Sequence, residues 1–400
     1  MDRLSLADLR YQLPVTKKVA YFQTGTYGPT LASVLKVIRE SMQYEATNGP
    51  ARPETKNVMA DQEESARIYL AKLLSVEPDE LGIGTNTTRS MQQVIRSIDW
   101  RSKDKFVTTS LEHVSTADAS KALMEECSVD VEIVNGDHHD ADLLEALDGA
   151  LTDNTKLMLI SHVASPNGRI LPVREAASLA HQKGIPVLLD AAQSIGQFPI
   201  QVPSLGCDYV IGSGPKWLLG PTGSGYIWVT PDQVGDFKPN FTPEIGSWSK
   251  LDEPQQLPNT RIRTELGTYN HALVIGLGQA AKTILQVGTD VIRDHVAELS
   301  RTLREEMANT NGINVLTPTE PGKSAGVTTL SFDGYTEKDL QDLIGWLDIE
   351  RNILVKFQWL TAPLQLELIG MRISVAGFNT QEEIHHLVDS IKEGIRVKEL

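Results

Sequence analysis

Apolar stretches recur through the first 230 residues and alternate with segments of helical periodicity. TKLMLISHVASPNG (155–168) is predicted to be a buried strand that leads into a Pro-Asn-Gly loop. IPVLLD (185–190) and DYVIGS (208–213) are also apolar at successive positions, which is typical of strands buried on both faces. Between the first two, REAASLAHQKG (174–184) has helical spacing and ends on a glycine. This alternation predicts an α/β fold whose mostly parallel sheet is covered by helices on both faces.

The same patterns extend the prediction in both directions. A helix is predicted over 59–75, a strand, polar turn and helix over 81–98, a strand ending in a polar turn over 105–113, and strands over 129–136 and 225–230.

The pattern changes near residue 283, where an α+β order begins. Its predicted elements are a long helix over 291–308, a strand over 326–334, a helix over 337–348, a strand over 371–377 and a helix over 382–395. We therefore predict a large domain over 16–282 and a small C-terminal domain over 283–400. Residues 1–15 are expected to pack on the small domain.

Composition narrows the class of protein. The chain has 400 residues, 40% of them apolar, and a formal net charge of -15, which argues against nucleic acid or an anionic membrane as a partner. Its two cysteines, Cys127 and Cys207, cannot form a disulfide framework or a thiolate zinc site, and no metal site is predicted. Without a signal-like or membrane-spanning apolar stretch, a cytoplasmic protein is expected.

Polar residues follow several of the predicted strands. In parallel sheets, ligands bind beyond the carboxyl ends of the strands, so these residues are candidates for a shared site. They are Thr87, His113, Ser165, Asp190, Gln193, Ser213 and Lys216.

Lys216 has an unusual setting, in DYVIGSGPKWLLGPTGSG (208–225). Most isolated lysines are solvated surface groups. Small and apolar neighbours at a strand end should remove hydration here, which lowers the pKa of the ammonium and leaves more free amine. A free amine can condense with a carbonyl group.

Asp190 ends the apolar run 26 residues before Lys216. A buried carboxylate needs a cationic partner, and a pyridinium nitrogen would serve. By itself, Asp190 is as well explained as a helix cap or a metal ligand. Its spacing to Lys216 on the adjacent apolar run favours the pyridinium.

An anion site is the third feature. Thr87 and Thr88 open a predicted helix, where free N–H groups and the helix dipole favour a phosphate, and Ser213 could add a hydroxyl. Alternatively, Thr87 is an ordinary N-cap. Together with Lys216 and Asp190, these residues predict a binding site for pyridoxal 5'-phosphate.

Several segments resemble class V aminotransferase-type pyridoxal phosphate enzymes, which include cysteine desulfurases, cystine C–S lyases and isopenicillin N epimerase-type proteins. The resemblance rests on LDAAQSIGQFPI (189–200) and CDYVIGSGPKWLLGPTGSGYIWV (207–229), and it covers most of residues 15 to 390. It implies a fold-type I enzyme with a seven-stranded-type sheet. It also implies a homodimer whose subunits share their active sites.

The resemblance also implies roles for individual residues. By TSLEHVST (109–116), His113 would stack on the cofactor ring. By RTELGTYNHALVIGLG (263–278), Thr268 would reach the phosphate bound by the neighbouring subunit. By MRISVAGFNTQEEI (371–384), Arg372 would hold the α-carboxylate of the substrate. Apart from the resemblance, Thr26 and Tyr27 in the Gly-rich loop TGTYGP (24–29) are candidate substrate contacts.

Departures from the family pattern bear on the reaction. Cysteine desulfurases carry a reactive cysteine before the final arginine, but residues 352–371 contain none, so a persulfide route is not expected. Pro215 replaces a histidine that often contacts the phosphate, and Ser165 replaces an asparagine near the cofactor oxygen.

These features favour a C–S lyase that abstracts an α-proton and eliminates a sulfur group from a cysteine- or cystine-like amino acid. Lys216 would be the base, with Asp190 and His113 supporting the cofactor. An epimerase, with Tyr27 as a second acid, and a class V aminotransferase remain alternatives. A cofactor-binding regulator is the non-enzyme alternative. The pattern Gly276-x-Gly278-x-x-Ala281 falls inside a predicted helix, which disfavours a dinucleotide site.

Overall fold

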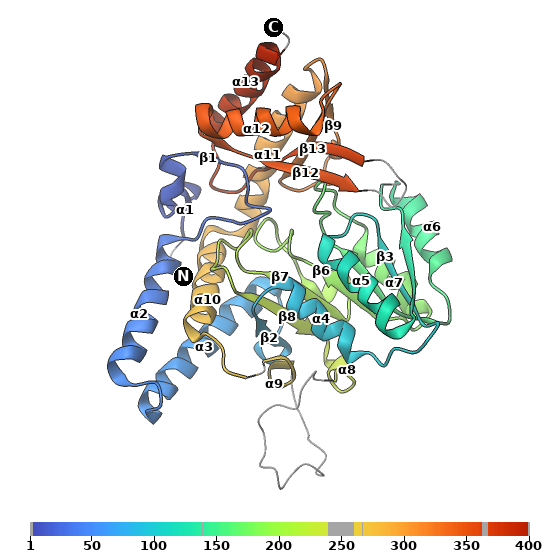
Figure 1. Cartoon of the computed structure of the whole chain (residues 1–400). Helices are drawn as coiled ribbons and strands as arrows, with labels where there is room; N and C mark the ends of the chain where they lie inside the picture. The colour runs from blue at the N-terminus through green and yellow to red at the C-terminus, as the bar shows by residue number, and fades with distance from the viewer. Residues whose placement is uncertain (1–2, 138, 239–259, 266, 362–366, 399–400) are drawn as a thin grey trace.

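The computed structural model describes residues 3–137, 139–238, 260–265, 267–361 and 367–398. At its centre is a seven-stranded sheet (Figure 1). Its strands, in spatial order, are β2 (Leu81–Gly84), β8 (Gly225–Val229), β7 (Tyr209–Ser213), β6 (Val187–Asp190), β5 (Thr155–Ser161), β3 (Lys105–Thr109) and β4 (Asp130–Val134). Only β8 runs antiparallel to its neighbours, so the predicted mostly parallel α/β sheet is confirmed.

Helices cover both faces because alternate strand residues are apolar on each side. Leu157 and Leu159 of β5 belong to one cluster, and Met158 and Ile160 belong to another. The first cluster contains residues of α4 (Thr87–Ser97) and α5 (Val114–Cys127). The second contains residues of α3 (Pro53–Leu74), α6 (Asp140–Ala150), α7 (Val173–Gln182) and α10 (His271–Val287). Burial on both faces explains why the strands read as continuous apolar runs.

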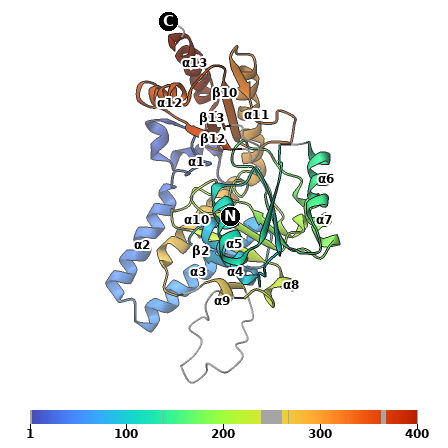
Figure 2. The same ribbon diagram turned by 45° about the vertical axis from the view of Figure 1, so that its right-hand side comes forward.

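A smaller four-stranded antiparallel sheet lies above the large sheet in both views (Figure 1 and Figure 2). In spatial order its strands are β12 (Lys356–Thr361), β13 (Glu367–Ser374), β10 (Val327–Phe332) and β9 (Ile313–Val315). Its helices are α11 (Thr289–Ala308), α12 (Glu337–Arg351) and α13 (Gln381–Lys398). This module has its own apolar cluster, which agrees with the predicted α+β order.

The N-terminal segment contacts both the small-sheet module and helix α10, which packs on the large sheet. Arg10 of α1 (Leu6–Tyr11) pairs with Glu383 at 2.9 Å and donates to the Phe378 carbonyl. The Leu4 N–H, in contrast, donates to Gln286 of α10. The domain division at residues 15 and 282 stays a prediction.

The remaining elements are short or were not predicted from the sequence. They are a 3-10 turn (Pro14–Lys17), β1 (Ala20–Tyr21), α2 (Ala32–Asn48), 3-10 turns (Pro78–Glu80 and Val202–Leu205), α8 (Pro231–Val234), α9 (Thr260–Thr264) and β11 (Ile353–Leu354). Helix α3 begins at Pro53, before the predicted start at residue 59, because proline suits the first turn of a helix. In the described ranges, every helix is too short or too polar to cross a bilayer.

Gly278 lies inside α10, which excludes the strand–turn–helix context of a dinucleotide loop. A Cβ at this position would lie 2.2 Å from the Cβ of Ala66 in α3. Glycine is therefore required here because the two helices pack closely.

Replacing Gly278 with alanine is expected to lower the free energy of unfolding by about 1–3 kcal/mol, because α3 and α10 must separate. Gly345→Ala in α12 is the matched control, since nothing lies within 4 Å of a Cβ at Gly345. That control should gain about 0.5–1 kcal/mol from helix propensity. Urea unfolding of both variants checks the opposite signs, and equal shifts would contradict the packing argument.

Candidate functional site

The candidate residues gather at one edge of the large sheet. β5, β6 and β7 are parallel neighbours and end at Ser161, Asp190 and Ser213. The segments that follow these strands carry Ser165, Gln193 and Lys216. The sheet thus brings together residues that are far apart in the sequence, as expected of an α/β ligand site.

The turn that carries Lys216 is held from several sides. The Leu219 N–H donates to the Lys216 carbonyl at 3.0 Å, and the Gly28 N–H donates to the Pro215 carbonyl at 2.7 Å. A Cβ on Gly28 would lie only 2.2 Å from the Lys216 oxygen, so a glycine is required where the N-terminal loop crosses this turn. The backbone of Lys216 is therefore fixed relative to the Thr26–Tyr27 loop.

The Lys216 amine is partly buried and surrounded by charged groups. Loss of hydration lowers its pKa to about 8; Asp190 opposes this effect and Arg372 adds to it. The direction is the one that the sequence predicts. Near neutral pH, much more free amine is therefore present than on a surface lysine.

Asp190 is a buried carboxylate with one local hydrogen bond, accepted from the Ala192 N–H at 2.8 Å. Burial raises its pKa, and the charge of Lys216 opposes that rise. Within the described ranges, no cation lies within ion-pair distance of its oxygens. A carboxylate in this state suits a cationic ring nitrogen.

His113 caps α5, with its Nδ1 accepting from the Ser115 N–H at 3.2 Å. The His113 side chain is exposed at the surface of the chain. Loss of hydration, together with the positive charges of Lys216, Lys356 and Arg372, lowers the pKa of its ring to about 4. The ring is therefore neutral near pH 7, with surface available for stacking.

Arg372 lies on β13 and reaches the edge of the large sheet. Its guanidinium donates to Thr26 Oγ1 at 2.6 Å and to the carbonyl and hydroxyl oxygens of Ser165, both at 3.2 Å. Its Nε is buried and has no partner in the described part of the chain. Neutral acceptors position the guanidinium and leave its charge available for an anion.

Gln193 has both ends of its amide bound within the protein. It donates to the Gly25 carbonyl and to Ser165, and it accepts from the Trp217 indole at 2.8 Å. Gln193 thus links the turn that bears Lys216 to the N-terminal loop.

The predicted anion turn lies beside the end of β7. Gly225 of β8 pairs with Ser213 and with Gly84, and a Cβ on Gly225 would come within 2.9 Å of the Asn86 backbone. Asn86, not Thr87, caps α4, by accepting from the Arg89 N–H. The Thr87 hydroxyl is buried without a partner among the described residues, and Thr88 is partly buried. An oxyanion would satisfy the Thr87 hydroxyl.

Two predicted residues are not drawn into this cluster. Thr268 is exposed, just before α10, and Tyr269 beside it donates to the buried Glu63 of α3. Tyr27 is 57% exposed, although its carbonyl accepts from the Tyr21 hydroxyl.

Three further residues belong to the cluster and were missed. Glu112 accepts from the hydroxyls of Thr109 and Ser161; burial raises its pKa to about 7, and the charge of Asp190 adds to the rise. The Tyr226 hydroxyl is buried and has no hydrogen-bond partner among the described residues. Burial and the charge of Asp190 raise its pKa. Lys356 of β12 has a pKa lowered to about 8 by burial, Arg372 and Lys216. The sequence offered a signal only for Lys356, a lone lysine in the apolar stretch ILVKFQW (353–359).

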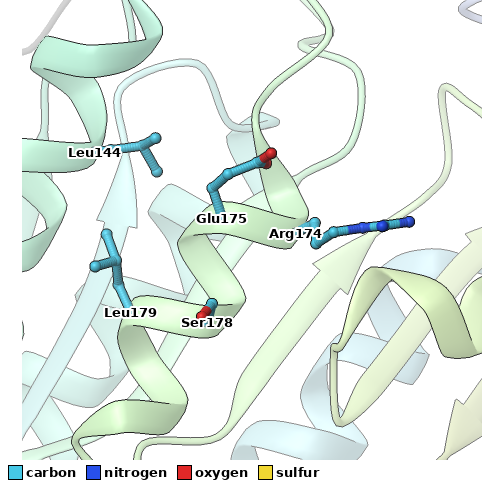
Figure 3. A pocket seen from close by; sticks show the side chains of 5 residues that line it. All are labelled: Leu144, Arg174, Glu175, Ser178 and Leu179. Carbon is cyan, nitrogen blue, oxygen red and sulfur yellow. The ribbon is translucent and has the colours of Figure 1, made fainter.

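Two hollows lie away from this cluster. One, of about 420 Å³, is on α6 and α7, lined by Leu144, Leu179 and Arg174 among others (Figure 3). The other, of about 510 Å³, lies around the Arg169–Asp140–Lys323 ion pairs. Neither is lined by the strand-end residues.

The strand-end residues fit pyridoxal phosphate. Lys216 supplies an amine for the aldehyde, Asp190 a counter-charge for the ring nitrogen, and Thr87 an unpaired hydroxyl for the phosphate. In the described residues, no cluster of His, Cys, Asp and Glu is arranged to hold a metal ion.

Comparisons with known proteins agree with this fit. The family model described as aminotransferase class-V matches residues 21–387. A probable cysteine desulfurase from Methanothermobacter thermautotrophicus is 26% identical over 397 residues, covering 96% of this chain and 97% of the relative.

Solved structures show the same fold. The apo structure of a cysteine desulfurase from Thermococcus onnurineus NA1 matches with a TM-score of 0.88 at 25% identity, and the match covers 100% of each chain. A mutant of C-DES with glycine covalently linked to its PLP cofactor matches at 0.86, with 23% identity over 96% of this chain and 99% of the other. A further matching structure is described as the complex between the cystine C–S lyase C-DES and its reaction product cysteine persulfide.

Proposed function

Since the chain belongs to the aminotransferase class-V family, we propose that it is a C–S lyase that cleaves cysteine- or cystine-like amino acids by β-elimination. Membership makes it a pyridoxal phosphate-dependent enzyme related to the cysteine desulfurases. The substrate and the course of the reaction are the proposal.

We assign roles at the cofactor from the contacts of each side chain. Lys216 would hold the cofactor covalently, Asp190 would supply the counter-charge for its ring nitrogen, and the neutral ring of His113 would stack on it. Thr87, Thr88 and Ser213 would bind the phosphate, an assignment that the unpaired Thr87 hydroxyl supports. Gln193 and Ser165 hold the surrounding loops in place through their mutual hydrogen bond.

The substrate is held from the side of the small sheet. Arg372 binds the α-carboxylate, since its guanidinium is bound only to neutral acceptors on Thr26 and Ser165. Tyr27, exposed in the same loop as Thr26, lines the substrate side. These contacts orient the α-hydrogen toward Lys216.

Pyridoxal phosphate, when bound, stabilises the electron pair left on the α-carbon when the proton departs. The free Lys216 amine takes that proton, since its pKa of about 8 suits a base near neutral pH. The sulfur group then leaves the β-carbon with a proton, as a thiol from a thioether or as a persulfide from a disulfide such as cystine. Addition of water to the remainder gives pyruvate and ammonium. The overall reaction consumes only the substrate and water, so it needs no oxidant or reductant.

The observation that carries the lyase proposal is the location of the two cysteines. Cys127 is the last residue of α5, and His113 caps the opposite end of this 14-residue helix, roughly 20 Å away. Cys207 is buried before β7, roughly 20 Å of chain from Ser213 at its far end, and burial raises its thiol pKa far above the ordinary range. Neither thiol is placed to accept sulfur from a substrate.

The test is to incubate the purified holoenzyme with L-cystine, a cysteine thioether and L-alanine, without added keto acid. We expect pyruvate and a sulfur product from the first two. Exchange of the α-hydrogen for deuterium without pyruvate would replace the lyase with an epimerase or an aminotransferase. A protein that binds no cofactor would remove the enzyme class and favour a regulator.

Two further expectations extend this proposal. We place Thr268 at the phosphate of a second subunit in a homodimer; its exposure and the anchoring of Tyr269 on Glu63 support that position. We also place the protein in the cytoplasm, from the sequence alone.

The lowered pKa of Lys216 predicts how the apoprotein takes up its cofactor. Only the neutral amine attacks the aldehyde, so with a pKa of about 8 the attachment rate should rise about tenfold between pH 6 and 7 and level off above pH 8. An amine at the ordinary value of 10.5 would continue to gain up to pH 10. Stopped-flow absorbance after adding pyridoxal phosphate measures the rate. Dividing by the rate for free N-acetyl-lysine at each pH removes the ionisation of the cofactor itself.

A further inference from the structure

A second lysine shares the substrate side of the site with Arg372. In the antiparallel register of β12 and β13, Lys356 lies directly opposite Arg372, so their side chains project from the same face. The preceding carbonyl, of Val355, accepts from the Gln23 side chain at 2.7 Å. Gln23 lies in the N-terminal loop that carries Thr26, so the backbone at Lys356 is fixed beside the contact between Thr26 and Arg372.

This pairing costs stability unless an anion compensates for it. Like charges directly opposite each other on adjacent strands are destabilising, and Lys216 adds a third cation. Lys356 has no ion pair or hydrogen bond to its ammonium in the described part of the chain, and Arg372 is bound to neutral oxygens. Asp190 is the carboxylate whose charge reaches Lys216, and it would serve the cofactor nitrogen. Lys216 is uncharged when it acts as the free base, so Arg372 and Lys356 remain as cations. One α-carboxylate therefore leaves one of these two unmatched.

The phosphate does not account for Lys356. The predicted phosphate turn lies beside Ser213 and Gly225 of the large sheet. Lys356, by contrast, belongs to the small sheet, on the side where Arg372 enters. Its position is that of a group that meets the substrate beyond the α-carbon.

We propose that Lys356 binds an anionic group on the substrate side chain, so that the enzyme prefers cysteine-type amino acids with a second negative charge beyond the sulfur. This assignment rests on the proposed lyase function and names its substrate class. In elimination from such a thioether, the carbon–sulfur bond breaks and the thiol leaves with its anionic group still opposite Lys356.

The test uses two thioethers of nearly equal size, S-carboxymethyl-L-cysteine and its neutral amide, S-carbamoylmethyl-L-cysteine. A charged hydrogen bond predicts that the holoenzyme favours the acid by roughly tenfold or more in kcat/KM. Lys356→Gln should abolish that preference, because it should lose far more kcat/KM with the acid than with the amide. Lys356→Arg should retain the preference. Retention of lysine-bound cofactor absorbance shows that each variant is folded.

Binding without turnover gives a second readout. Calorimetric titration of the holoenzyme with glutarate and with its monoamide compares the same charge difference in ligands that have no amine to react. We expect tighter binding of glutarate in the wild type and in Lys356→Arg, and equal binding in Lys356→Gln.

The outcomes separate this assignment from the lyase proposal. Equal use of both thioethers by the wild type, or an equal loss for both in Lys356→Gln, overturns the assignment; the second result would mean that Lys356 serves the α-carboxylate. If neither thioether gives pyruvate but glutarate still binds through Lys356, the lyase proposal fails and the anion site stands.

Discussion

Lys216→Ala is expected to lose covalently held cofactor and to lower pyruvate formation by about a thousandfold, the usual contribution of a positioned general base. The variant should still bind pyridoxal phosphate through Asp190 and the Thr87 turn, but without a covalent link. Dialysis should therefore remove the cofactor and its colour. Borohydride should fix the cofactor to the wild type and not to the variant. Absorbance and mass after reduction measure this.

Lys356→Ala is the matched control for this experiment. The pKa values of both lysines are lowered to about 8, so pKa alone does not decide which amine carries the cofactor. Geometry does, because Lys216 follows the strand next to Asp190, whereas Lys356 belongs to the small sheet. Lys356→Ala should therefore keep the reducible link. Cofactor fixed by borohydride in Lys216→Ala, or its loss in Lys356→Ala, would contradict the assignment.

Asp190→Asn is expected to lower turnover by roughly a hundredfold or more, because a buried cation that loses its partner is worth about 3 kcal/mol or more. Asparagine keeps the shape and can still accept from the Ala192 N–H, so the substitution removes only the charge. Steady-state pyruvate formation at saturating cofactor measures the loss.

Thermal unfolding with and without cofactor separates charge from damage to the fold. Without cofactor, Asp190→Asn should unfold at the same temperature as the wild type or higher, because it removes a buried carboxylate whose pKa burial raises. With cofactor, the gain in unfolding temperature should be smaller in the variant than in the wild type. A lower unfolding temperature of the apoprotein would mean that Asp190 is a structural residue.

Local patterns in the sequence determined much of this protein. Apolar runs predicted β5, β6 and β7, because a strand buried on both faces needs apolar residues at successive positions. The residues after those runs predicted Asp190 and Lys216, since neighbouring parallel strands end at one edge. The resemblance added Arg372, which no local pattern would link to a site more than 150 residues away.

The tertiary structure decided which distant groups meet. Strand register placed Lys356 opposite Arg372. Folding also brought Thr26, more than 300 residues away in the sequence, into contact with the Arg372 guanidinium. Burial in the folded protein raises the pKa of Glu112 to about 7, the charge of Asp190 adds to the rise, and the hydrogen bonds from Ser161 oppose it. Periodicity reports whether a position is buried; register, desolvation and charge pairing depend on what another segment places there, so these properties could not be predicted from the local sequence.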